Sequence, residues 1–245
     1  MTPKDIRLYR SKLVSTGNIM QLYSYENPVF VNHISTRSDY KKNPYSFKSI
    51  ASLQRSKNNL FITVSANLTK FTKFITMTTK ETVLDRKDFL IYFNQFRKNF
   101  TRLFGYNLKY VAVLERQKLR GKKENNLGSW HIHMIVFNDE KLNFLKLKKA
   151  WSIGSVDIKR LSKNSQVPVY LMKYLSKENI LINDKAILKS HHLKEASIFY
   201  DVSKLELNDF DYQTTYSVYD GSKVTFYEKH LYKPYQTPYK NVEFS

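Results

Sequence analysis

Two histidines separated by one residue, His131 and His133, are the side chains of this sequence best suited to chemistry. They lie in the apolar segment 130–137, whose β-branched and aromatic residues predict a β-strand. Because successive side chains of a strand point to opposite faces, both imidazoles are expected on the same face. Neutral imidazole is a common metal ligand, so the pair could form half of a metal site. Two histidines on a solvent-facing sheet surface would give the same pattern.

The acid that could complete this site is Glu115, near the end of a second predicted strand at 110–116. The glycines, lysines and asparagines between these strands predict a long hairpin loop. A symmetric hairpin places Glu115 opposite His131 and Val113 opposite His133, with Cβ atoms about 5 Å apart. We therefore predict a metal site formed by Glu115, His131 and His133. A solvated glutamate at a strand end is the alternative.

A second candidate set combines two tyrosines with two lysines on a helix that is predicted to open at Pro168. Tyr170 and Tyr174 are four residues apart and share a helix face, while Lys173 and Lys177 repeat that spacing on the neighbouring stripe. A phenol with a pKa of about 10 is a poor nucleophile at neutral pH. Nearby ammonium groups favour the phenolate, so this set could supply a nucleophile. An amphipathic helix with packed tyrosines and solvated lysines would look the same.

Several further elements are expected to position these residues. Residues 74–78 alternate as a strand does, and a helix is predicted between Asp85 as N-cap and Gly105 just past its end. Its phenylalanines recur at helical spacing, which indicates packing and no cofactor. A short helix at 142–151 and a strand at 154–158 follow.

The charge of the chain indicates a polyanionic partner. Its 41 Lys and Arg against 21 Asp and Glu give a net charge of +20 among 245 residues. Residues 200–245 carry five Lys against seven Asp and Glu, so the nucleic-acid surface is expected in the first two hundred residues, with Arg55 and Lys57 among the candidates. The absence of cysteine excludes disulfides and cysteine chemistry. No apolar run approaches the roughly 18 residues of a membrane span, and no signal peptide is evident, so we expect a cytoplasmic protein.

Three parts of the chain are distinguished by composition. Residues 1–55 predict an irregular arm with short strands, and residues 56–199 predict the core domain. Residues 200–245 predict an extension that contains a β-hairpin over 213–229, turning at Asp220-Gly221.

The order of these motifs resembles that of the HUH endonucleases, in which U is a hydrophobic residue. It is most similar to the rolling-circle replication initiators of small plasmids and bacteriophages. The strand at 74–78, the Glu115 and His131-Ile132-His133 pair, and the tyrosine helix carry this resemblance over roughly residues 50–195. The run from Glu115 to Gly121 is similar to the acid-bearing strand and basic turn of the family, which adds Arg116, Lys118 and Arg120 as candidate DNA contacts.

The resemblance implies an α+β fold, with a central antiparallel sheet of about five strands, RRM-like, and helices packed on it. It places the histidines on a central strand with the tyrosine helix beneath. It also implies a metal-dependent, site-specific single-strand DNA endonuclease and strand transferase. Such an enzyme nicks one strand at an origin hairpin, keeps a 5′-phosphotyrosine, frees a 3′-OH for priming and later rejoins the strand.

The resemblance leaves several choices open. Mg²⁺ or Mn²⁺ is expected, although two imidazoles suit Mn²⁺ better. Tyr174 fits the Tyr-x-x-Lys-acid pattern of single-tyrosine relatives and is expected to act first, with Tyr170 second, but the order could be reversed. No phosphate-binding Gly-x-x-x-x-Gly-Lys-Ser/Thr loop is present, so a separate helicase is expected in the bacterial cell. A single-strand transposase or relaxase of the same superfamily, or a non-catalytic basic nucleic-acid-binding protein, are the alternatives.

Overall fold

The structure is a computed structural model of α+β type, and its described residues form two five-stranded antiparallel sheets and four helices. The chain divides into two compact units: a terminal unit of Met1–Tyr40, Lys163–Ser165 and Glu195–Ser245, and a central unit of Lys41–Ser162 and Gln166–Lys194. The residues described are 8–30, 50–69, 71–118, 127–137, 142–160, 167–175, 185, 187–202, 210–217 and 221–231.

The central unit contains the predicted antiparallel sheet, which confirms the fold expected from the sequence. Its strand order is β6-β3-β5-β4-β7, and each neighbouring pair is antiparallel. The strand that carries the histidines, β5, is therefore the middle one. The bounds are β3 Lys73–Thr79, β4 Tyr110–Lys118, β5 Leu127–Val136, β6 Gly154–Arg160 and β7 Leu188–Lys189.

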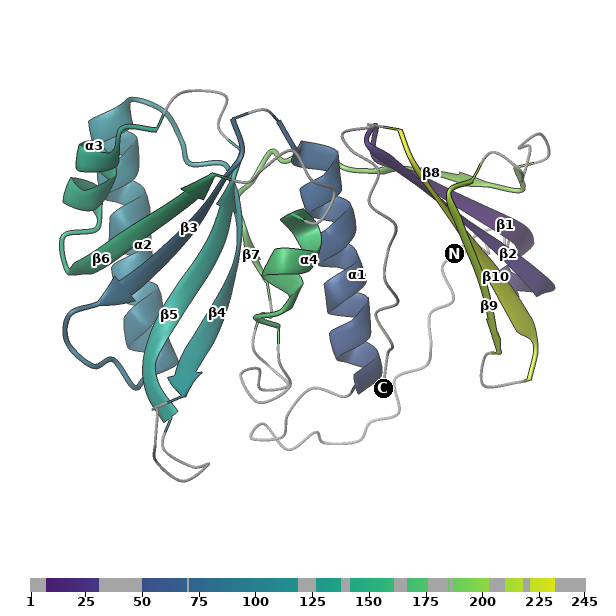
Figure 1. The fold of residues 1–245 in the computed structure, drawn as a ribbon, viewed down its shortest axis with the longest axis horizontal. Coiled ribbons are helices and arrows are strands. Elements are labelled where there is room, and N and C mark those ends of the chain that lie inside the picture. The colour runs from purple at the N-terminus through teal and green to yellow at the C-terminus, as the bar shows by residue number, and fades with distance from the viewer. Residues whose placement is uncertain are drawn as a thin grey trace, which may run out of the picture. The chain divides into compact units, whose positions relative to one another are not determined.

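Helices cover both faces of this sheet (Figure 1). One face packs against α2 (Arg86–Phe104) and α3 (Phe144–Ala150), and the other packs against α1 (Ile50–Asn67) and α4 (Val167–Met172). Alternation along β5 decides which side chains meet which helices. Ile132 and Met134 belong to the core under α2, whereas Ile135 belongs to the core under α1 and α4. The histidines share the face of Ile135 and so lie on the α1 and α4 side.

Helix α2 has the ends that the sequence predicted. The Asp85 carboxylate accepts hydrogen bonds from the backbone N–H groups of Lys87 and Asp88 at the N-terminus. Gly105 ends the helix in the left-handed conformation with φ 80°, a backbone angle that glycine adopts without strain. The stripe facing the sheet is fully buried and consists of Phe89, Phe93, Phe96 and Phe100.

The terminal unit contains a second sheet, where the sequence suggested an irregular arm and a separate extension. Its strand order is β8-β1-β2-β10-β9, with the bounds β1 Leu8–Ser15, β2 Ile19–Phe30, β8 Ser197–Tyr200, β9 Tyr212–Ser217 and β10 Lys223–His230. The predicted hairpin is present as β9 and β10, but β10 pairs with β2 on its other side. Boundaries at 55 and 199 were expected from composition, whereas this unit joins both ends of the chain. Leu13, Leu22 and Tyr227 form its small core, a contact between distant segments that local sequence patterns do not reveal.

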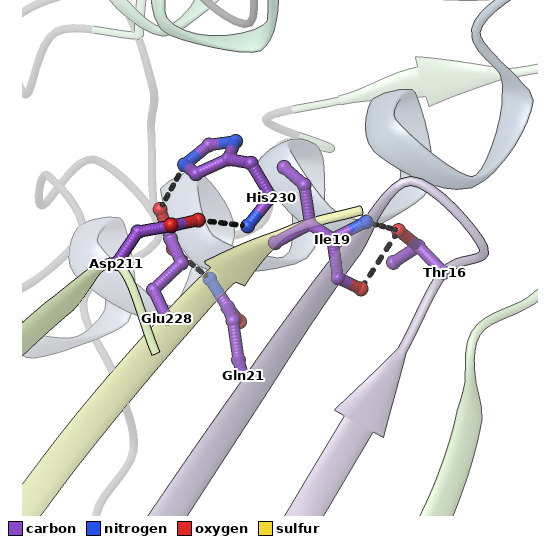
Figure 2. Close-up of polar contacts among 6 residues, drawn as sticks. All are labelled: Thr16, Ile19, Gln21, Asp211, Glu228 and His230. Atoms are coloured by element: carbon purple, nitrogen blue, oxygen red, sulfur yellow. Dashed lines mark hydrogen bonds and ion pairs between the residues drawn. The ribbon is translucent and has the colours of Figure 1, made fainter. Parts of the chain in front are cut away.

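A polar network links three elements of this second sheet (Figure 2). The Gln21 amide donates to Glu228 Oε2 over 2.9 Å, and Glu228 Oε1 lies 3.0 Å from His230 Nε2. The backbone N–H of His230 donates to Asp211 Oδ2 over 2.7 Å. The hydrogen bond with Glu228 raises the pKa of His230, and burial offsets part of that rise. The network therefore ties β2, β10 and the residues before β9 together.

Candidate functional site

The hairpin of β4 and β5 places the acid and the histidines in the register that the sequence predicted. Glu115 lies opposite His131, and Val113 lies opposite His133. On its other side β5 pairs with β3, where Thr76 lies opposite His133. Because directly opposed residues of an antiparallel sheet point to the same side, these five side chains share the face covered by α1 and α4.

Glu115 and His133 meet directly. Glu115 Oε2 and His133 Nε2 are 2.9 Å apart, and the His133 side chain is 7% exposed against 33% for Glu115. The other ring nitrogen, His133 Nδ1, lies 3.2 Å from Thr76 Oγ1. Both nitrogens of a buried imidazole thus have a polar partner within the sheet, which fixes the rotation of the ring.

His131 is half-buried on the same face, and no hydrogen bond joins its ring to another side chain among the described residues. Burial lowers the pKa of His131, the neighbouring His133 lowers it further, and the Glu115 carboxylate partly offsets both. Within the described ranges, no three His, Asp or Glu side chains are grouped closely enough to hold a metal ion. The structure therefore brings two of the three expected ligands together, with the third one pair further along the ladder.

The spacing of the Glu115 and His133 atoms is nevertheless compatible with a divalent cation. Neighbouring ligands in an octahedral shell with bonds of about 2.1 Å are about 3 Å apart. The oxygen and nitrogen atoms here are 2.9 Å apart. A mixed set of one carboxylate and imidazole nitrogens suits Mn²⁺ better than Mg²⁺, which prefers oxygen. The residues present thus fit the ion that the sequence implied.

The tyrosines lie against this histidine. The Tyr174 ring stacks on His133 with centroids 3.6 Å apart and planes 13° apart. Tyr170 lies one ring further away, with its centroid 6.0 Å from that of Tyr174 and 4.8 Å from that of Phe74. The Phe74 ring of β3 also lies nearly parallel to the Tyr174 ring, with centroids 6.1 Å apart. Phe74 therefore packs against both tyrosines.

The tyrosine helix is shorter than predicted. α4 ends at Met172, and the chain continues as a tighter turn in which the Tyr174 N–H donates to Leu171 O over 3.2 Å. The Leu175 N–H donates to Met172 O over 3.1 Å. Lys177 lies outside the described residues. The turn, rather than a continued helix, sets the direction of the Tyr174 ring towards His133.

The surroundings of Tyr174 keep its hydroxyl protonated. Burial raises the pKa of Tyr174, and its hydrogen bond with Tyr170 and the nearby Glu115 carboxylate raise it further. Lys173 is exposed, and its Nζ lies 5.6 Å from the Tyr170 ring centroid. The phenolate that a nucleophile needs is therefore not favoured by these contacts alone.

The predicted DNA contacts are placed unevenly. Arg55 is exposed and Lys57 half-buried on α1, the helix that packs with α4 in one core. Arg116 faces away from Glu115, because it is the next residue of the strand, and its guanidinium lies 5.8 Å from the Trp130 ring centroid. The last of the set are Lys118, which ends β4 and of which the structure describes the backbone only, and Arg120, which lies outside the described residues.

Sequence reasoning missed two residues that touch the site. Thr76 and Phe74 were interpreted only as strand-formers, although Thr76 contacts His133 and Phe74 stacks with it, with centroids 5.9 Å apart. Their role depends on β3 being the second neighbour of β5. A strand order of this kind is not visible in one sequence.

A comparison with models of protein families gives a match that covers the site. Residues 72–179 match the model of the replication-associated protein family named for ORF2. This segment contains Glu115, both histidines and both tyrosines. The match confirms the resemblance to replication initiators and supports a role in DNA replication.

The other comparisons add no relative. No curated protein matches the chain, and no solved structure does. In the part of the chain that the structure describes, none of the helices is both long enough and apolar enough to cross a membrane.

Proposed function

We propose that this protein is a rolling-circle replication initiator that nicks and rejoins one DNA strand through a tyrosine. The observation that carries the proposal is the stacking of Tyr174 on His133 over 3.6 Å, beside the 2.9 Å pair of His133 and Glu115. A phenol, an imidazole and a carboxylate thus lie together inside the segment that matches a replication-associated family. Such a group suits phosphoryl transfer to a tyrosine.

Glu115 and His133, with His131 after a side-chain adjustment, would hold a divalent cation. That ion, Mn²⁺ or Mg²⁺, would supply Lewis-acid polarisation of the scissile phosphate and a fixed point for its orientation. Binding through Glu115 would also neutralise one of the charges that raise the pKa of Tyr174. The remaining burial would keep the phenol protonated until a DNA strand is in place.

Tyr174 is the proposed first nucleophile because its ring touches His133. Its phenolic oxygen forms a bond to phosphorus, and the bond from phosphorus to the 3′ oxygen breaks. The phenol proton leaves to solvent or a neighbouring base, and the 3′ oxygen takes up a proton to become a 3′-OH. The strand stays attached through a 5′-phosphotyrosine, so a later attack by a 3′-OH rejoins it without a nucleotide cofactor.

Tyr170 and Lys173 complete the proposed set. Tyr170 shares a hydrogen bond with Tyr174 and would accept a second strand during the transfer that closes the circle. Lys173, above the Tyr170 ring at 5.6 Å, would neutralise charge that develops on a phosphate held there. Lys177 is proposed for the same role from its spacing in the sequence. A separate helicase and an origin hairpin remain part of the proposal.

Covalent capture of DNA tests the proposal. The full chain is incubated with Mn²⁺ or Mg²⁺ and a library of single-stranded DNA hairpins with randomised loops, and adducts are separated on a denaturing gel. We expect an adduct whose bound DNA begins at one preferred sequence and which a chelator prevents. The Tyr170→Phe/Tyr174→Phe double variant should give none, whereas Tyr92→Phe, an exposed tyrosine of α2, should behave as wild type. No adduct with wild type, or an adduct with the double variant, contradicts the proposal.

A non-catalytic DNA-binding module is the second candidate, and one observation favours it. His133 Nε2 is directed at Glu115 and no three ligands converge among the described residues, as expected for a structural pair. That function predicts salt-sensitive DNA binding that is unchanged by chelator and by loss of both tyrosines. The same adduct experiment, with binding measured in parallel, separates the two functions.

A further inference from the structure

Thr76 is the side chain near the site for which the proposed function gives no role. It lies on β3 directly opposite His133, and its Oγ1 is 3.2 Å from His133 Nδ1. His133 is buried, with 6% of the residue exposed, so Nδ1 has little access to water. A buried ring nitrogen that loses its partner costs free energy. The Thr76 hydroxyl therefore matters to the orientation of His133.

The imidazole of His133 must work in two forms if it binds a cation. Without the ion, the contact of Nε2 with the Glu115 carboxylate requires a proton on Nε2, so in the neutral ring Nδ1 carries a lone pair. With the ion, Nε2 offers its lone pair and Nδ1 carries the proton. The partner of Nδ1 must then change from a donor to an acceptor without moving.

A hydroxyl can serve both forms, because it has one proton to donate and lone pairs to accept. A carboxylate could only accept from Nδ1, and a lysine could only donate to it. Stacking of Tyr174 at 3.6 Å sets the plane of the ring, while the contacts of Nε2 and Nδ1 set its rotation within that plane. The two constraints are independent of each other.

We propose that Thr76 is the positioning residue of His133, donating its hydroxyl proton to Nδ1 in the metal-free protein and accepting the Nδ1 proton when Nε2 binds a cation. The inference rests on the proposed function, because it assigns His133 as a ligand. Thr76 acts through His133 and does not contact DNA or the ion itself.

The test uses Thr76→Val, which keeps the branched shape that suits a strand but removes the hydroxyl. Thr76→Ser restores the hydroxyl, and Thr78→Val is the matched control, since Thr78 lies on the same strand and face opposite His131. The full chain is labelled with ¹⁵N-histidine. The first measurement is the Nδ1 resonance of His133 in the metal-free protein at one fixed pH, and the second is Mn²⁺ affinity.

We expect Thr76→Val to move the Nδ1 resonance of His133 and to weaken Mn²⁺ binding by about 10–100-fold, the usual effect of losing an outer partner of a ligand. Thr76→Ser and Thr78→Val should keep both values near wild type. An unchanged resonance in Thr76→Val overturns the proposal, and so does a moved resonance with unchanged affinity. A purely structural role would alter the two threonine variants alike.

Failure of the proposed function gives a different result. If wild type binds no Mn²⁺, the metal site is wrong, and the Nδ1 resonance in the metal-free protein alone decides whether Thr76 donates to His133. If Thr76→Val does not fold, Thr76→Cys replaces it, because a thiol is a weak hydrogen-bonding group of similar size.

Discussion

His133 is the side chain on which the site depends, because four other side chains contact its ring. Glu115 and Thr76 meet its two nitrogens, Tyr174 stacks on it, and Phe74 lies nearly parallel to it at a centroid distance of 5.9 Å. A change at any of these residues alters the position of the ring. The tyrosine and the acid are therefore coupled through one imidazole.

The order of the tyrosines can be decided by single substitutions. We expect Tyr174→Phe to lose the covalent DNA adduct to the level of the double variant, because Tyr174 is the tyrosine that stacks on His133. Tyr170→Phe should keep the first adduct and lose the rejoining of two strands, since its ring lies one position further out. Adduct yield and the yield of rejoined product on a preformed hairpin measure the two steps. An adduct that disappears only in Tyr170→Phe reverses the order.

At the scale of elements, local patterns predicted those parts of the fold whose partners are near in sequence. The β4 and β5 hairpin follows from alternation and from a loop that can only bring the two strands back together. The ends of α2 follow from Asp85 and Gly105, whose side chain and backbone freedom act locally. These were the elements that allowed the register of Glu115 with His131 to be predicted.

The features that were not predicted depend on distant partners. β1 and β2 are held by β8 and β10, which come from the other end of the chain, so their own polar sequence suggested an arm. The end of α4 at Met172 is set by packing of Leu171 and Leu175 in the core under α1, and helix propensity does not reveal it. Thr76 joined the site only through the neighbouring strand β3.

Gly154 offers a test of the contact between β6 and β3. A Cβ atom at Gly154 would overlap the Thr78 carbonyl, and that same carbonyl accepts the Trp151 indole N–H over 2.7 Å. We expect Gly154→Ala to lower the free energy of unfolding by about 1–3 kcal/mol, the usual cost of overpacking. Urea unfolding measures it, with the exposed neighbour Ser155→Ala as control. Equal stability of Gly154→Ala and wild type would show that the strand adjusts freely.

The polar network of the terminal sheet makes its stability depend on pH (Figure 2). Glu228 raises the pKa of His230, so the folded protein binds the His230 proton more tightly than the unfolded chain, whose pKa is about 6.5. This stabilisation is complete below the unfolded pKa and is lost as pH rises through the folded pKa.

We therefore expect His230→Gln to destabilise most at acidic pH, with the difference from wild type shrinking as pH rises. Urea unfolding across about pH 5 to 9, read from a probe in the terminal unit, measures it. The titratable groups that face His230 are Glu228 and Asp211, and Glu228→Gln should remove the same pH dependence. A difference that grows with pH is the opposite sign and excludes this cause.

At the scale of the whole molecule, charge is divided unequally between the two units. The central unit has 30 Lys and Arg against 10 Asp and Glu, a net +20, whereas the terminal unit has 11 of each and is neutral. The entire excess of positive charge therefore belongs to the unit that carries the tyrosines. Phosphate contacts are expected there.

Salt dependence measures that expectation. We expect Arg55→Ala on α1 to weaken binding to a single-stranded oligonucleotide and to reduce the slope of log affinity against log salt by about 0.7, the contribution of one phosphate contact. Lys223→Ala, an exposed cation of the terminal sheet, should leave affinity and slope unchanged. Equal losses in both variants would mean that the strand crosses both units.

The composition of the terminal sheet has a consequence for synthesis. β1 and β2 leave the ribosome first, but β10 pairs with β2 and carries Glu228, the partner of Gln21 at a separation of 207 residues. Until translation reaches that strand, β1 and β2 have only each other, and a lone hairpin is marginal in water. A premature stop codon before β10 would thus cost the N-terminal strands their order as well, while the strands and helices of the nicking centre would already be complete.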